Sequence, residues 1–396
     1  MATSRRNKTA TILVALIVLT VTIPACGGSG TGPAGPPDPE GSGYKGLQVL
    51  YGDPHIHTIL SDGDESPDFA LRYARDVADL DWACITDHSE HFQDAARAGL
   101  NYYRTLPAKY DEPGRFCVLF GYEWTNLYYG HRNVYSLDNM VPLFPSNMDE
   151  YFDVNDWWIA LEPYDVITVS HHPMIDTPYV WWDYTNPGVD VAVEFYSKWG
   201  LSLREGNPRP INVRSEANGI FPAMGGGERR YGLIAGSDTH MSRPGTYLEE
   251  SRQGHALQYV QPGITGVWAV DFTREAIFDS MRNRHTYGVT GTIVDLKFTV
   301  NGFIMGSETT ALNPPTIWIE ASSDEVITEV AISSISKIGI VGLAIYTPNS
   351  LDFETTFVDQ TFADDLAYTV RVTLANTDMA VASPVWVDYE APGPVI

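Results

Sequence analysis

Six short apolar runs in this chain lead directly into histidine, aspartate or glutamate side chains. The runs cover residues 47–51, 82–85, 116–120, 166–169, 189–195 and 233–235. Apolar runs of this length are typical of buried β-strands, and helical spacing occurs between several of them, most clearly over 66–80. Strands that alternate with helices predict a parallel sheet. Polar groups at the carboxyl ends of successive strands then predict a barrel of the β/α type.

Two pairs of potential metal ligands have the i, i+2 spacing of a strand, His55 with His57 and Asp238 with His240. Because residues i and i+2 of a strand point to the same face, each pair can direct two side chains at one point. A single histidine near a strand end is more often hydrogen-bonded than bound to a metal. Such groups at several strand ends favour a metal centre instead. Imidazoles and carboxylates without thiolates are typical of catalytic zinc, manganese or iron.

The order of these motifs resembles that of the PHP superfamily, the polymerase and histidinol phosphatase domain. The resemblance rests on the segments 52–58, 61–63, 86–90, 121–124, 130–133, 171–173 and 236–240. Two further runs, 243–245 and 284–291, are similar to an exported branch of that superfamily whose substrates the motifs do not reveal. The resemblance covers the chain from about residue 46 to its end.

This resemblance implies a distorted seven-stranded β/α barrel that holds two or three divalent cations. One cation would be held by His55, His57, Glu123 and Asp238. A second would share Glu123 and add His131 and His172, and a third would use Asp62, His88 and His240. His171 competes with His172, because strand alternation lets only one of two neighbours face the centre. The motif favours His172.

A centre of this kind predicts hydrolysis. Two cations about 3.5 to 4 Å apart can hold a hydroxide between them and neutralise charge on a phosphoryl group. We therefore expect a metal-dependent hydrolase of a phosphoester. A carboxyl ester or amide is the alternative substrate of the same centre. A surface lipoprotein that keeps a metal-stabilised barrel only as a binding module is the alternative without catalysis, and open metal positions argue against it.

Three residues are predicted to act on the substrate. Glu123 is the shared carboxylate, while Arg132 and Arg243 follow predicted ligands closely and can grip a phosphate with a guanidinium fork. In so acidic a chain, each arginine is at least as well explained by pairing with a surplus carboxylate. Lys198 is a weaker candidate for the same role.

Two aspartates, Asp53 and Asp87, stand beside the predicted ligands. Metal-bound histidines commonly donate their second N–H to a carboxylate, so these aspartates are candidates for orienting the imidazoles. Capping of the strand ends is an equally good interpretation. His285 lies near the end of the predicted barrel, and we expect a structural role for it.

The charge of the chain bears on its partners. The net charge is -25, and removal of the three cations Arg5, Arg6 and Lys8 with the N-terminal segment leaves -28. Binding to nucleic acid needs a basic surface, so we expect a small-molecule or sugar-type phosphoester instead.

Residues 46–292 form the predicted barrel. Residues 293–396 carry strand-like runs without convincing helices, which predicts a small antiparallel β-sandwich.

The N-terminus reads as an export signal. Residues 1–26 combine a basic start with an apolar run too short for a comfortable membrane span. Cys26 after a small residue predicts a lipid anchor, and an ordinary cleaved signal is the alternative. Residues 27–45 are a flexible tether rich in Gly, Pro and Ser. We therefore expect a membrane-anchored lipoprotein that faces the periplasm or the cell exterior. We also expect the two cysteines of the folded part, Cys84 and Cys117, to be buried free thiols.

Overall fold

The computed structural model describes residues 42–390, except 93–96, 176–179, 181, 205, 207, 212–217, 226–228, 253 and 255–256. The predicted signal segment, Cys26 and nearly all of the tether lie outside the described residues. Among the helices that the structure describes, none combines the length and the apolar character needed to cross a membrane.

The first part of the chain mixes strands with helices. Its strands are β1 (Gln48–Ile56), β2 (Trp82–Ile85), β3 (Cys117–Trp124), β4 (Arg132–Ser136), β5 (Val166–His171), β6 (Asp190–Ser197), β7 (Gly200–Leu201), β8 (Gly232–Ala235), β9 (Ile264–Ala269) and β10 (Thr286–Val289). Its helices are α1 (Pro67–Asp76), α2 (Arg97–Tyr103), α3 (Leu106–Tyr110), α4 (Val154–Leu161), α5 (Ile220–Met224) and α6 (Arg274–Arg282), with short 3-10 turns η1 (Ser42–Tyr44), η2 (Ser89–Phe92) and η4 (Asp149–Tyr151).

Helix α1 shows how the sequence sets these elements. Ser66 caps the helix by accepting a hydrogen bond from the backbone N–H of Phe69, and Pro67 occupies the first turn, where its missing N–H costs nothing. Ala70, Leu71 and Ala74 form the buried face. The predicted helix over 66–80 is therefore confirmed, with its end nearer residue 76.

The strands of this part join in an order that follows the chain. The pairs β1–β2, β2–β3, β5–β6 and β6–β8 are parallel. The segment that follows β8 lies next to the end of β1. Ile56 and Thr239 form a parallel bridge there, and the His57 N–H donates to the Thr239 carbonyl at 3.0 Å. The carboxyl ends of β1, β2, β3, β5 and β8 consequently lie at one edge of the sheet.

Strand β4 departs from the predicted alternation. It is antiparallel to both β3 and β5. Residues 125–131, which connect β3 to β4, are too few for a helical crossover, so the chain turns back on itself. The mixed α/β architecture with a large sheet is confirmed, whereas a regular (β/α)7 barrel stays a prediction.

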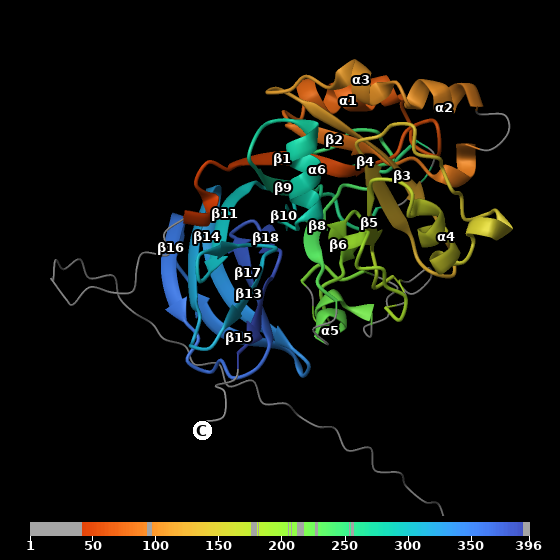
Figure 1. The fold of residues 1–396 in the computed structure, drawn as a ribbon. Coiled ribbons are helices and arrows are strands. Elements are labelled where there is room, and N and C mark those ends of the chain that lie inside the picture. The colour runs from red at the N-terminus through yellow and green to blue at the C-terminus, as the bar shows by residue number, and fades with distance from the viewer. Residues whose placement is uncertain are drawn as a thin grey trace, which may run out of the picture.

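The C-terminal part consists of strands. They are β11 (Val294–Val300), β12 (Phe303–Ile304), β13 (Glu308–Ala311), β14 (Thr316–Ser336), β15 (Gly339–Tyr346), β16 (Ser350–Val358), β17 (Leu366–Leu374), β18 (Met379–Ala382) and β19 (Val385–Tyr389). Most pairs are antiparallel, while β13 and β19 are parallel. Figure 1 shows these strands gathered on one side of the molecule, away from α1, α2 and α3.

The two parts share hydrogen-bonded strands. β9 pairs with β1, β10 pairs with β9, and β10 also pairs with β18, where Tyr287 lies opposite Ala382. The predicted boundary at residue 292 and the predicted sandwich stay predictions.

Cys84 and Cys117 are buried and free, as the sequence predicts.

Candidate metal centre

The predicted ligands come together where the strands of the first part end. His55 lies in β1 and His57 directly follows it, while Glu123 is the second-to-last residue of β3. The other predicted ligands lie in the segments next to the strands: Asp62 and His88 follow β1 and β2, His131 precedes β4, and His172, Asp238 and His240 follow β5 and β8. His171, the competitor of His172, is the last residue of β5. Each of these side chains is buried or nearly so. The topology thus brings together groups that are far apart in the sequence.

One group of ligands surrounds a single point. The Nε2 atoms of His55 and His57 lie 3.2 Å apart, and each is 3.4 Å from Glu123 Oε2. Asp238 Oδ1 is 3.7 Å from His55 Nε2 and 3.3 Å from His57 Nε2. Each imidazole nitrogen thus lies close to both carboxylate oxygens, and ligand atoms of His55, His57 and Glu123 lie within 4.8 Å of one another. Such a donor set can hold a cation. These are the four residues predicted for the first cation.

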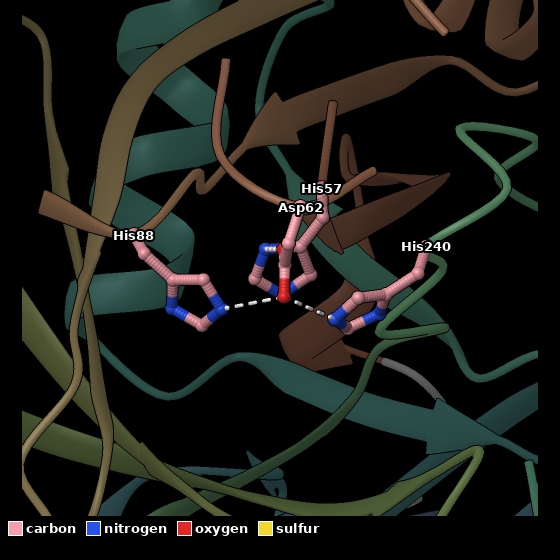
Figure 2. A group of neighbouring side chains, drawn as sticks. All are labelled: His57, Asp62, His88 and His240. Carbon is pink, nitrogen blue, oxygen red and sulfur yellow. Dashed lines mark ion pairs between the residues drawn. The ribbon is translucent and has the colours of Figure 1, made fainter. Parts of the chain in front are cut away.

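A second group is centred on Asp62 (Figure 2). Asp62 Oδ2 lies 3.3 Å from His88 Nε2 and 3.2 Å from His240 Nε2. His57 joins this group as well, since its Nδ1 is 3.5 Å from Asp62 Oδ1. Sequence reasoning assigned His57 to the first group alone. The structure places its ring between the two groups.

A third group contains three imidazoles and the other oxygen of Glu123. His131 Nδ1 lies 2.8 Å and His171 Nε2 lies 3.4 Å from Glu123 Oε1. His172 packs edge-on against both of these histidines, with ring centroids 5.0 Å from His131 and 4.2 Å from His171. Ligand atoms of all three histidines lie within 4.8 Å of one another.

Strand alternation does not decide whether His171 or His172 is the ligand. β5 ends at His171, and His172 has a left-handed backbone with a φ of 35°. Alternation holds only inside a strand, so this turn lets both side chains reach the same region. The structure brings His171 to Glu123 and His172 to His131, and the choice between them stays open.

The electrostatics of the centre suit a cation. Burial raises the pKa of Glu123 and Asp238, but the neighbouring imidazoles, together with Lys198 at Asp238, outweigh burial and hold both pKa values well below their usual range. Burial lowers the pKa of His55 and His88, yet the carboxylates around them hold both pKa values well above the usual range. Protons on imidazoles therefore balance the carboxylates without metal.

The donor set also fits metal binding at the level of single atoms. His131 Nε2, His171 Nδ1 and His172 Nδ1 are buried and have no hydrogen-bond partner among the described residues. A buried nitrogen without a partner costs free energy unless a proton donor or a metal satisfies it. Burial lowers the pKa of His171 to about 4, so this imidazole is neutral and can offer a lone pair at neutral pH.

Glu194 is the member of the site to which the sequence analysis gave no role. Its two carboxylate oxygens lie 3.3 and 3.1 Å from His55 Nδ1, on the side of the ring opposite the ligand group. Burial raises the pKa of Glu194 to about 7, against the lowering effect of His55. The available signal was an acidic residue inside the apolar run 189–195. Glu194 thus takes the orienting role expected of Asp53 and Asp87.

Those two aspartates hold backbone and hydroxyl groups instead. Asp53 Oδ1 accepts hydrogen bonds from the backbone N–H of His55 and of Ser237. Asp87 accepts hydrogen bonds from the backbone N–H and hydroxyl of Thr58 and from the Ser61 hydroxyl. Both therefore act as caps of the loops that carry the ligands, which was the second interpretation.

Replacing Glu194 by glutamine should weaken metal binding without unfolding the protein. The amide oxygen can still accept from His55 Nδ1, but the charge that favours this tautomer is lost. We expect the affinity for the cation beside His55 to fall about 10- to 100-fold. A competition titration with a metal-binding dye measures the change. Glu354→Gln is the matched control, because Glu354 accepts from the ring N–H of Trp318 in the C-terminal strands. Equal affinity in both variants would contradict the orienting role.

The prediction that Arg132 grips a phosphate requires a correction. Its side chain is buried, donates from Nη1 to the Tyr129 carbonyl at 2.8 Å and lies over the rings of Trp124 and Trp158. His131 faces Glu123, and the next residue of an extended chain points the opposite way. Arg132 therefore packs behind the centre rather than holding a phosphate within it. Arg243 is exposed, and its predicted role stays a prediction.

Lys198 is the cation that reaches the centre. It directly follows β6, and its Nζ lies 2.5 Å from His240 Nδ1 and 3.9 Å from Asp238 Oδ1. Trp199 donates from Nε1 to Asp238 Oδ2 at 2.8 Å. Burial lowers the pKa of Lys198 although the carboxylates of the centre oppose this. Sequence reasoning ranked Lys198 below the two arginines.

By sequence, this chain matches a protein family and individual proteins that have no assigned activity. A family model described as a protein of unknown function (DUF3604) matches residues 227–312, which include Asp238 and His240. Uncharacterized proteins of Chlamydia muridarum and Chlamydia pneumoniae are 29% and 25% identical over 219 and 372 residues. The alignments cover 50% and 86% of this chain but 34% and 57% of those proteins. The chain thus spans about half the length of the curated relatives it matches.

Solved structures show weaker likeness. One is a two-domain protein from Bacteroides vulgatus that is described as containing a predicted PHP-like metal-dependent phosphoesterase. Its TM-score is 0.45 at 15% identity, and the alignment covers 86% of this chain and 96% of that protein chain. The lesion-specific endonuclease Q from Pyrococcus furiosus has a TM-score of 0.37 at 13% identity, covering 59% of this chain and 56% of its own. The predicted ligands lie together at one place. The resemblance of this chain to the PHP superfamily, and to an exported branch of it, stays a prediction.

Proposed function

We propose that this chain is a metal-dependent hydrolase of phosphoesters that uses two or three divalent cations of zinc, manganese or iron. The observation that carries the proposal is the convergence of buried imidazoles and carboxylates at one edge of the sheet. Buried carboxylates in such number are costly unless cations balance them. A purely structural site would need far fewer ligands.

Glu123 is suited to serve two cations. Its Oε2 faces His55 and His57, while its Oε1 faces His131 and His171. A third cation would be held by Asp62 together with His88 and His240. When bound, such cations supply Lewis acidity and an activated water as nucleophile. The protein's own residues fix where that chemistry takes place.

Charge supports a phosphoester over a neutral ester. Four carboxylates contact the imidazoles of the centre, and they are Asp62, Glu123, Glu194 and Asp238. Two dications balance at least the charge of these carboxylates, and a third leaves the centre positive. A positive centre with a low local dielectric favours an anionic substrate.

The proposal extends to the partner and the location. A net charge of -25 disfavours a nucleic acid substrate, so we propose a small-molecule or sugar-type phosphoester. We also propose an exported protein with a lipid on Cys26 that faces the periplasm or the cell exterior. This part rests on residues 1–26, which lie outside the described residues.

The test is a substrate panel with metal-loaded protein. Phosphomonoester, phosphodiester, carboxyl-ester and amide reporters are compared, with short single- and double-stranded oligonucleotides as further substrates. We expect turnover of a phosphoester that a chelator abolishes. Turnover of carboxyl esters or amides alone would replace the proposed substrate class. Tight binding of a ligand without any turnover would favour a non-catalytic role.

A further inference from the structure

One strand end of the centre contributes a cation where its neighbours contribute ligands. β1, β2, β3, β5 and β8 each end in an imidazole or a carboxylate of the centre. β6 runs between β5 and β8 in the sheet, and the residue that follows it is Lys198. Lys198 therefore stands in the same ring of side chains as the metal ligands.

The position of Lys198 is fixed by several contacts. Its backbone N–H donates to the Ser237 carbonyl, and its own carbonyl accepts from the N–H groups of Gln258 and Tyr259 at 3.0 Å. The Trp199 ring lies 5.0 Å from Nζ. Only 3% of the side chain is exposed. An ammonium group held this deeply needs a negative partner close by.

Its present partners are themselves metal ligands. Nζ contacts His240 Nδ1 and lies near Asp238 Oδ1, so Lys198 stands between the group around His55 and the group around Asp62. Once Asp238 is engaged by a cation, less of its charge remains to balance the ammonium. An anionic oxygen of a bound substrate can supply the missing partner.

We propose that Lys198 binds the anionic oxygens of the substrate beside the metal centre, and that it thereby selects negatively charged esters over neutral ones. This inference rests on the proposed hydrolase function and names the residue that recognises the charge of the substrate. Arg132 cannot fill this role because it packs behind the centre against the rings of Trp124 and Trp158.

The experiment compares the metal-loaded wild type with Lys198→Met, Lys198→Gln and Lys198→Arg. Lys297→Met is the matched control, because Lys297 lies in β11 and pairs with Glu320. Inorganic phosphate is titrated into each protein by calorimetry, and the bound metal is measured by elemental analysis. Steady-state kinetics with the best phosphoester and a neutral carboxyl ester are recorded beside these measurements.

We expect the Met and Gln variants to keep their metal and to bind phosphate about 10- to 100-fold more weakly, as loss of one charge-assisted hydrogen bond predicts. KM for the phosphoester should rise by a similar factor, and the preference for the phosphoester over the neutral ester should fall. Lys198→Arg should recover part of the phosphate affinity, and Lys297→Met should behave like the wild type.

Three results would overturn the inference. Unchanged phosphate affinity in metal-loaded Lys198→Met and Lys198→Gln removes the binding role. Loss of metal in both variants shows that Lys198 only supports the ligands. A wild type that does not bind phosphate removes the inference as well. Phosphate binding that depends on Lys198 in a protein without phosphoester turnover would instead contradict the proposed function and leave the anion site in place.

Discussion

Replacing Asp238 by asparagine should leave the fold intact and remove both metal loading and hydrolysis. The carboxylate faces His55 and His57, and asparagine keeps its shape but not its charge. Asp238 has a φ of 53°, a left-handed conformation that asparagine tolerates and alanine adopts only with strain. We expect kcat/KM to fall at least about a thousandfold, because loss of a metal ligand removes roughly 4 kcal/mol of transition-state stabilisation.

Elemental analysis of the purified variant measures this loss directly. His57→Ala is a second variant with the same expected result, since its ring faces two of the ligand groups. His285→Ala is the control, because His285 lies between α6 and β10 and takes part in none of the ligand groups found among the described residues. Undiminished metal in both Asp238→Asn and His57→Ala would remove the assignment of the centre.

The ligand set was predictable because its signals are local. The i, i+2 pairs at His55 and at Asp238 depend only on strand geometry, and short apolar runs locate the strands that carry them. Once parallel strands share an edge, their ends must lie close together. The order of the motifs then narrows which of the polar residues meet.

Glu194 and Arg132 show what local signals leave out. The contact between Glu194 and His55 joins residues 139 positions apart and depends on the register of β6 against β8, the strand that leads to the bridge with β1. Nothing near Glu194 in the sequence fixes that register. Arg132 was misplaced because β4 was not predicted, and without a strand the alternation that turns Arg132 away from His131 cannot be applied.

The C-terminal strands illustrate a similar limit. In the sequence, the strand-like runs 316–321 and 326–332 are separated by the turn-forming residues Ser322-Ser323-Asp324, yet β14 continues from Thr316 to Ser336. Ladder bonds to β11 reach Ser323, and bonds to β17 begin at Ile327. Partners on several strands therefore keep extended a segment whose polar composition favours a turn.

Removing the metal should destabilise the protein, and the effect should grow with pH. Without metal, the carboxylates hold the pKa of His55 and His88 well above the usual range, so both imidazoles carry protons at neutral pH. The stability that these protonated pairs contribute is complete below about pH 6.5 and is lost as pH rises through the raised pKa values. Metal binding needs neutral imidazoles, so loading releases these protons and becomes tighter at higher pH.

Denaturation of loaded and chelated protein at pH 6, 7 and 8 measures this effect. With free metal at about a thousand times its dissociation constant, each cation should stabilise the fold by about 4 kcal/mol, and the gap should widen towards pH 8. Calorimetric titration of metal in two buffers with different ionisation enthalpies detects the released protons. His57 contributes none, since burial with His240 and His88 nearby lowers its pKa to about 3. Equal stability with and without chelator, or heats independent of the buffer, would contradict a centre in which metal replaces protons on His55 and His88.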